Sequence, residues 1–135
     1  MSTSQGEIAL QSEGDIVLAR RAVREAAGQA GFGATDVTRI VTASSELARN
    51  IIKYAGTGVV RWRSLEDKTL PGLEIQFADH GPGIPDVEMA LQEGYTTSNG
   101  LGMGLPGAKR LMDEMDIQSA ADKGTTVTIR KWRRS

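Results

Sequence analysis

A long glycine-rich segment, residues 80–104, is the feature that most constrains how this chain can fold. It contains Pro82, Pro85 and the polar run 96–99. Apart from a short helix that could begin at Asp86, it shows neither helical nor strand periodicity. Loops of this length inside a compact domain are uncommon, and they are usually functional lids or disordered segments. The sequence therefore predicts a lid between two regularly patterned regions.

The patterned regions predict the order strand, two helices, two strands, lid, helix and two strands. Helical spacing of apolar residues covers 15–30, 35–52 and 105–115, and strand-like runs cover 7–11, 59–64, 73–78, 117–121 and 125–132. Thr35 or Asp36 is the expected N-cap of the second helix, and Met115 belongs to the apolar stripe of the third. This order suggests one mixed sheet with helices on a single face, a two-layer α/β sandwich. The 135 residues are expected to form a single domain, 1–135, because they leave no room for a second core.

Charge and composition narrow the range of partners. The 16 basic residues nearly balance the 17 acidic ones, so we expect no binding to nucleic acid or to an anionic membrane. The basic residues at 130–134 are interpreted as a soluble tail. Because there is no cysteine, disulfides, Cys-zinc sites and cysteine nucleophiles are excluded. No apolar stretch is long enough to cross a bilayer and no secretory signal begins the chain, so a cytoplasmic protein is expected.

The first candidate site residue is Asp79, which ends the apolar run 73–78. A carboxylate at the end of a strand can accept a hydrogen bond from the exocyclic amine of a base. Gly81 and Gly83 would let a flat ring approach the backbone without a Cβ clash. The same residues are also typical of an ordinary turn in which Asp makes local hydrogen bonds.

A second candidate is the glycine run that opens onto the third helix, with Gly100, Gly102 and Gly104 at alternate positions. Free backbone N–H groups and the positive end of a helix can cradle a phosphate, although such a run is also typical of a flexible hinge. A dinucleotide-binding motif does not fit, because no good strand precedes Gly102. A Walker A loop does not fit either, because Ala108 rather than Lys follows Gly107.

A third candidate is the pair Glu46 and Asn50, which lie at i and i+4 and so project from one face of the second helix. This face is opposite the apolar stripe and includes Arg39 and Lys53, so periodicity alone indicates a solvent-exposed face. The functional alternative is a magnesium site, in which Asn50 supplies an oxygen ligand and Glu46 orients or deprotonates a hydroxyl. His80, the only histidine, is interpreted as a loop residue without a catalytic role.

The order and spacing of these motifs resemble the four boxes of GHKL ATPases. The four boxes are Glu46-Leu47-Ala48-Arg49-Asn50, Asp79-x-Gly81-x-Gly83, Gly100-x-Gly102-x-Gly104-Leu105 and Gly124-Thr125-Thr126. Nearly the whole chain is also similar to the RsbT-type switch serine kinases of bacterial stress signalling. That similarity lies in residues 15–17, 31–33, 45–50, 54–56, 81–86 and 104–114.

The resemblance implies a Bergerat-type ATP site that is closed by the lid, roughly residues 84–99. Asn50 would bind Mg²⁺, and Glu46 would position or activate the attacking hydroxyl. Asp79 would recognise adenine. The other implied contacts are Gly81 and Gly83 beside the base, Gly100, Gly102 and Gly104 at the phosphates, and Thr125 or Thr126 near the adenine.

The resemblance also implies partners. A kinase of this type phosphorylates a serine or threonine of a STAS-domain protein within a stressosome complex. After its release it activates a downstream output protein such as a phosphatase. Glu46 favours this interpretation, because a nucleotide sensor needs no group near the attacking hydroxyl.

The alternative is an anti-sigma factor or nucleotide-gated switch that acts mainly by sequestering its partner, for example a sigma factor. Both interpretations need the ATP site, so the boxes do not separate them. Related anti-sigma factors contact their partners through the first helix, which makes Arg20 and Arg24 candidate contacts. An ordinary solvated helix surface is the favoured interpretation of both arginines.

Overall fold

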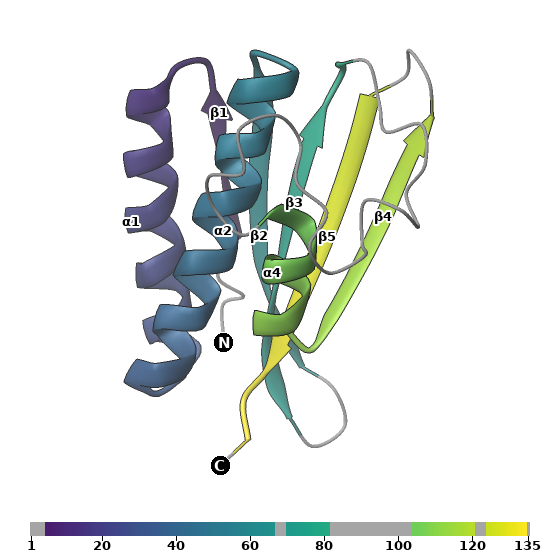
Figure 1. The fold of residues 1–135 in the computed structure, drawn as a ribbon. Helices are drawn as coiled ribbons and strands as arrows, with labels where there is room; N and C mark the ends of the chain where they lie inside the picture. The colour runs from purple at the N-terminus through teal and green to yellow at the C-terminus, as the bar shows by residue number, and fades with distance from the viewer. Residues whose placement is uncertain (1–4, 67–69, 82–103, 121–123, 135) are drawn as a thin grey trace.

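The computed structural model describes residues 5–66, 70–81, 104–120 and 124–134, which form two layers (Figure 1). One layer is a five-stranded sheet, and the other consists of the helices α1, α2 and α4. In chain order, the elements are β1 (Gln5–Leu10), α1 (Glu13–Gln29), α2 (Ala34–Tyr54), β2 (Gly58–Glu66), β3 (Pro71–Asp79), α4 (Gly104–Leu111), β4 (Glu114–Ala120) and β5 (Gly124–Trp132).

The sheet has the strand order β1-β2-β3-β5-β4, and every pairing between its described strands is antiparallel. The predicted two-layer sandwich with helices on one face is confirmed, but its predicted mixed sheet is wrong. The connections give the reason. Each turn between β1, α1, α2 and β2 reverses the chain, so β2 enters antiparallel to β1 (Figure 1). Strands β3 and β4 run in the same direction, but β5 lies between them and pairs with both.

Glycines with positive φ end both long helices. Gly31 follows α1 with φ 91°, a conformation that costs glycine little because it has no Cβ. Its N–H donates to the carbonyl of Gly28, and the N–H of Phe32 donates to that of Ala27. These are the two bonds of a Schellman motif. Gly56, with φ 86°, follows α2, and its N–H donates to the carbonyl of Ile51.

Two predicted helix limits differ from the structure. Helix α2 begins at Ala34, ahead of the predicted caps Thr35 and Asp36. Helix α4 ends at Leu111, so the prediction that Met115 belongs to its stripe is wrong, and this residue lies in β4. The reason is a non-local hydrogen bond of 3.0 Å, in which the N–H of Asp113 donates to the carbonyl of Arg130 in β5. This bond starts the pairing of β4 with β5.

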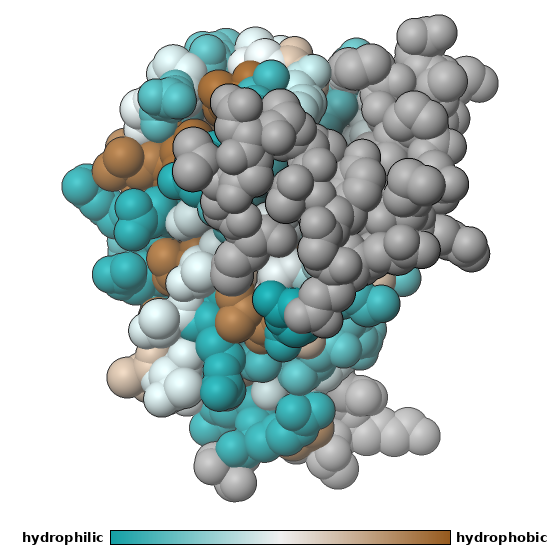
Figure 2. Space-filling model, in the orientation of Figure 1, coloured by the Kyte–Doolittle hydropathy of each residue, from teal (hydrophilic) through white to brown (hydrophobic). Residues whose placement is uncertain are grey.

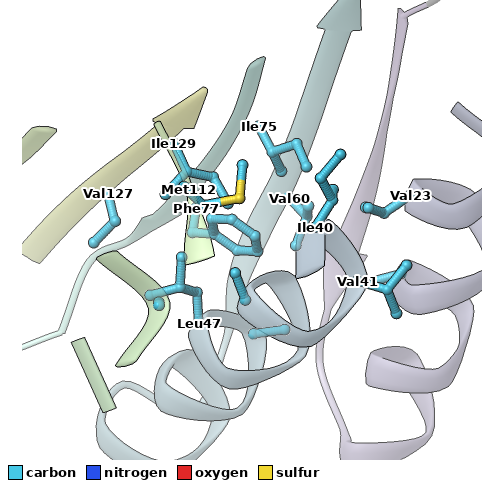
Figure 3. Packing of buried hydrophobic residues seen from close by; sticks show 14 of the residues in the cluster. Val23, Ile40, Val41, Leu47, Val60, Ile75, Phe77, Met112, Val127 and Ile129 are labelled. Carbon is cyan, nitrogen blue, oxygen red and sulfur yellow. The ribbon is translucent and has the colours of Figure 1, made fainter. Parts of the chain in front are cut away.

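The core lies between the sheet and the helices (Figure 3). Alternate residues of the central strands face the helices, because successive side chains of a strand point to opposite faces. The buried residues of this face include Val60, Leu73, Ile75, Phe77, Val127 and Ile129, and α2 covers them with Ile40, Ala43, Leu47 and Ile51. Figure 3 shows Phe77, Met112 and Ile129 gathered on the sheet side of α2. The core therefore packs α2 against β3.

The opposite face of the sheet carries a row of alternating charges. The strand registers align Arg63, Glu74, Arg130 and Glu114 across β2, β3, β5 and β4. Glu74 accepts hydrogen bonds from Arg63 Nε and from Arg130 Nε, each at 2.8 Å. The hydrogen bond from Arg63, with a further contribution from Arg130, lowers the pKa of Glu74. Neighbouring side chains of this row are thus ion-paired with one another across the strands.

Hydrophilic residues cover much of the surface in Figure 2, with apolar residues gathered near the upper ends of α1 and α2 in that view. The large hydrophobic side chains that are exposed in the described part include Val17, Leu18 and Tyr54. None of the described helices combines the length and the apolar character that a membrane crossing requires.

Candidate functional site

The predicted pair Glu46 and Asn50 lies on α2, on a face that is only partly open to solvent. The whole Glu46 residue is 9% exposed, so the interpretation of this face as solvent-exposed is wrong at this position. Arg39 and Lys53, on the same predicted face, are exposed. Periodicity identifies the face of a helix but not what packs over it, and here α4 packs against α2. The Asn50 side chain forms no hydrogen bond with the described residues, so its amide oxygen is available to a ligand.

The Glu46 carboxylate joins α2 to the first residue of α4. Its Oε1 accepts a hydrogen bond from the backbone N–H of Gly104 at 3.4 Å, and its Oε2 is ion-paired with Nη1 of Arg49 at 2.6 Å. Gly104 has a positive φ of 64°, a conformation that favours glycine. The structure therefore brings the predicted carboxylate and one predicted phosphate-binding glycine together.

Asp79 joins the end of β3 to the start of β5. Its Oδ1 accepts hydrogen bonds from the N–H of Gly81 at 2.8 Å and from the N–H of Thr125 at 3.2 Å. The first bond belongs to the local turn that the sequence allowed as an alternative interpretation. The second bond connects the second and the fourth of the four sequence boxes, which are far apart in the chain. Asp79 shares the helix-facing side of β3 with Phe77. Its Oδ2 forms no hydrogen bond with the described part of the chain, so one carboxylate oxygen remains for a ligand.

Two glycines allow the close approach of these segments. A Cβ on Gly81 would lie 2.6 Å from the Cβ of Ala55, the residue that caps α2. A Cβ on Gly124 would overlap the backbone of Asp79 and lie 2.8 Å from the Cα of His80. The ends of α2 and β3 and the start of β5 therefore meet at one place because these two positions lack side chains.

The two candidate threonines lie on opposite faces of the sheet. Thr125 shares the helix-facing side of β5 with Val127, whereas Thr126 pairs with Ala78 and points to the other side. The hydroxyls of Thr125 and Ser119 are 2.9 Å apart. Only Thr125 therefore lies beside Asp79.

Ser119 was not among the predicted site residues. Because it lies opposite Thr125 in the β4–β5 pairing, only the strand register could have identified it.

Other predicted site residues are not described. Gly83, Gly100 and Gly102 lie outside the described residues, as do the predicted lid and the short helix from Asp86. His80 is described and exposed. In the described part of the chain, no group of three or more His, Cys, Asp or Glu side chains is arranged to hold a metal ion.

The site residues follow one another along α2. Glu46 meets α4 at Gly104, Asn50 lies one turn further on, and Ala55 meets Gly81 beside Asp79. At 1.5 Å per residue, the two ends of this row are roughly 13 Å apart along the helix axis. The arrangement offers the Asp79 carboxylate at one end and the backbone N–H of Gly104, at the start of α4, at the other. Between them lies the Asn50 amide, whose oxygen has no hydrogen-bond partner among the described residues.

Comparison with known proteins identifies the family of the chain. The chain matches the histidine kinase-like ATPase domain family over residues 10–131. It is 48% identical over 130 residues to the serine/threonine-protein kinase RsbT of Bacillus subtilis, covering 96% of this chain and 98% of that protein. It is 34% identical over 122 residues to the anti-sigma F factor of Caldanaerobacter subterraneus subsp. tengcongensis, covering 84% and 82% of the two chains.

Solved structures share the fold at lower sequence identity. A structure of the RsbU and RsbW domains of a Mycobacterium tuberculosis protein matches with a TM-score of 0.67 and 20% identity. That match covers 98% of this chain and 34% of the longer one. The mycobacterial sensor histidine kinase MprB matches with a TM-score of 0.57 and 20% identity over 98% of this chain and 100% of the other.

Proposed function

The chain belongs to the histidine kinase-like ATPase domain family, and we propose that it is an ATP-dependent serine/threonine kinase whose substrate is another protein. The observation that carries the proposal is the position of Glu46, held against the first N–H of α4 with Asn50 one helical turn away. A carboxylate at that point is what a hydroxyl nucleophile requires beside a transferable phosphate. The 48% identity to a serine/threonine-protein kinase supports the same activity.

In this proposal the adenine lies at the Asp79 end of the row. The free Oδ2 of Asp79 accepts a hydrogen bond from the exocyclic amine, while Oδ1 stays bonded to the N–H groups of Gly81 and Thr125. Those two bonds orient the carboxylate before the base arrives. Gly81 and Gly83 border the base, and Thr125 rather than Thr126 is the threonine near it.

The phosphates lie at the α4 end. Gly100, Gly102 and Gly104 donate their N–H groups to phosphate oxygens, helped by the positive end of the helix. Asn50 fits a magnesium ion, because its amide oxygen is a hard ligand without a partner in the described residues and Mg²⁺ commonly shares its ligands between protein and phosphates. When bound, Mg²⁺ supplies charge neutralisation on the phosphate oxygens.

The reaction is an in-line phosphoryl transfer. The oxygen of a serine or threonine hydroxyl forms a bond to the γ-phosphorus, and the bond from that phosphorus to the bridging β–γ oxygen breaks. ADP leaves with the electron pair of that bond, and the hydroxyl proton passes to the Glu46 carboxylate. Glu46 thus orients the acceptor and receives its proton.

For the acceptor we propose a STAS-domain protein in a cytoplasmic stressosome-type assembly, with a downstream output protein such as a phosphatase activated after release. This choice rests on the resemblance to RsbT-type kinases. Helix α1 supports a protein partner, because Val17 and Leu18 are exposed there beside Arg20 and Arg24, which have no ion pair in the described part. An exposed surface that combines apolar and unpaired basic side chains suits a partly acidic protein.

A second candidate function is a sequestering switch that binds a sigma factor, because the chain is also 34% identical to an anti-sigma F factor. This function uses the same ATP site and the same α1 surface. It differs from the kinase in not requiring Glu46 to receive a proton.

The test is transfer of label from ATP radiolabelled on its γ-phosphate, with Mg²⁺ and candidate STAS-domain proteins from the same genome. Glu46→Gln removes the proton acceptor, and Glu66→Gln, at the exposed end of β2, is the matched control. Label on one candidate that persists with Glu66→Gln and disappears with Glu46→Gln supports the kinase. Tight ATP binding with no transfer to any candidate contradicts it and favours the sequestering switch, which a sigma-factor binding assay then tests.

A further inference from the structure

Arg49 forms an ion pair with Glu46, the proposed proton acceptor. Its Nη1 lies 2.6 Å from Oε2 of Glu46, which is short for an ion-paired hydrogen bond. The Arg49 side chain is 53% exposed and that of Glu46 12%. A mainly solvated cation thus holds one oxygen of a mainly buried carboxylate.

The other carboxylate oxygen contacts a group that the proposed reaction needs. Oε1 accepts from the N–H of Gly104 at 3.4 Å, longer than the usual 2.7–3.2 Å for such bonds. In the proposed site this N–H belongs to the phosphate cradle. A phosphate oxygen would form the stronger, charge-assisted bond there, and Oε1 would then be released while Arg49 keeps Oε2.

We propose that Arg49 is a positioning residue for phosphoryl transfer, which anchors Oε2 of Glu46 so that Oε1 turns from Gly104 to the acceptor hydroxyl when ATP binds. This inference rests on the proposed kinase function. Anchoring limits the rotation of the Glu46 side chain, and correct orientation of a catalytic group contributes strongly to rate. The guanidinium also offsets the repulsion between the carboxylate and the phosphates.

Helix α2 contains a matched control for this ion pair. Nearer the start of α2, Arg39 pairs with Asp36 through the same i, i+3 spacing at 3.0 Å. Arg39 is 50% exposed, close to the 53% of Arg49. Asp36, however, lies in the first turn of α2, away from α4's first residue. Loss of Arg39 therefore reproduces the loss of a surface arginine on the same helix without disturbing Glu46.

The experiment measures kcat, the KM for ATP and direct ATP–Mg²⁺ binding for Arg49→Ala, Arg49→Lys and Arg39→Ala. We expect Arg49→Ala to lower kcat roughly 10- to 100-fold, the size of effect that a misplaced catalytic group produces. The KM for ATP should change much less. Arg49→Lys should recover part of the rate, since it retains the charge but not the planar guanidinium. Arg39→Ala should match the wild type in every measurement.

A double-mutant comparison separates positioning from a structural role. If Arg49 acts through Glu46, Arg49→Ala should have no further effect on kcat in a Glu46→Gln background. An equal loss in both backgrounds, or full kcat in Arg49→Ala when the wild type transfers phosphate, overturns the inference and leaves the kinase proposal intact. A wild type that binds ATP but phosphorylates no acceptor overturns both.

Discussion

The backbone N–H of Thr125 donates a hydrogen bond of 3.2 Å to the carboxylate of Asp79 across a sequence separation of 46 residues. One residue ends β3 and the other lies at the start of β5. Because the same carboxylate oxygen also accepts from the N–H of Gly81, the side chain is oriented by two backbone donors. The other oxygen is thereby presented to the helix side of the sheet, where the base is proposed to bind.

Replacing Asp79 with Asn tests this orientation. Asn retains an oxygen for the two N–H groups, so its NH₂ group would face the exocyclic amine of adenine and could not accept from it. We expect ATP affinity to fall roughly 10- to 100-fold, since hydrogen bonds to charged groups contribute about 1.5–3 kcal/mol. Titration calorimetry measures the affinity, with Asp116→Asn on the opposite face of the sheet as control. Unchanged affinity in Asp79→Asn would remove Asp79 from the base site.

The two threonines provide an internal comparison. Thr125→Val should weaken ATP binding roughly two- to tenfold, because a neutral hydrogen bond contributes about 0.5–1.5 kcal/mol. Thr126→Val should leave binding unchanged, because Thr126 points to the opposite face of the sheet. The same calorimetric titration compares them. A larger loss with Thr126→Val would show that the wrong face has been assigned to the nucleotide.

Asn50 and Glu46 should separate binding from transfer. Asn50→Ala removes the proposed magnesium ligand, so the gain in ATP affinity on adding Mg²⁺ should disappear. Glu46→Gln keeps the size of the side chain but cannot accept the proton, so transfer should slow while nucleotide binding persists. ATP binding with and without Mg²⁺, followed by transfer rates, distinguishes the two. Equal loss of binding in both variants would contradict the separate roles.

Gly124→Ala should destabilise the fold. The residue has φ 85°, and a Cβ there would overlap the backbone of Asp79. Alanine would have to adopt this left-handed conformation while its Cβ clashes with the backbone. The two costs together should lower the free energy of unfolding by roughly 2–5 kcal/mol. Gly28→Ala is the control, because its Cβ would meet no atom within 4 Å inside α1 and alanine favours a helix. Urea unfolding of both variants should show a lower free energy of unfolding for Gly124→Ala and a higher one for Gly28→Ala.

The Glu74 cluster should make stability depend on pH. Arg63 and Arg130 lower the pKa of Glu74 in the folded protein, so its ionised form stabilises the fold. That contribution is fully present above the unfolded pKa of about 4.3, and it is lost as pH falls through the lower folded value. Urea unfolding of wild type and Glu74→Gln should therefore differ at neutral pH and converge in acid. Glu7→Gln, from a more exposed ion pair with Arg61, should show little difference at either pH, and a comparable effect there would argue against the special role of Glu74.

Local patterns in the sequence were enough to identify the elements and the order of the motifs. Apolar spacing predicted the helices and strands that the structure contains in the described residues, because a side chain at the buried face of an element must be apolar wherever that element packs. The turn at Asp79 and the glycine at the start of α4 were likewise visible, since each depends on neighbouring residues. The close similarity to a family explains why the roles of these motifs could also be proposed.

Tertiary structure decided what depends on contacts between distant residues. The antiparallel sheet and the place of Met115 in β4 follow from strand pairing, which one-dimensional periodicity does not contain. The burial of Glu46 depends on α4, and the choice of Thr125 over Thr126 depends on the register of β5 against β3. Arg49 follows Glu46 by three residues in the sequence and was still missed, because any arginine on a helix suits solvent equally well. Periodicity assigns a residue to a face, whereas only the packed chain determines what that face meets.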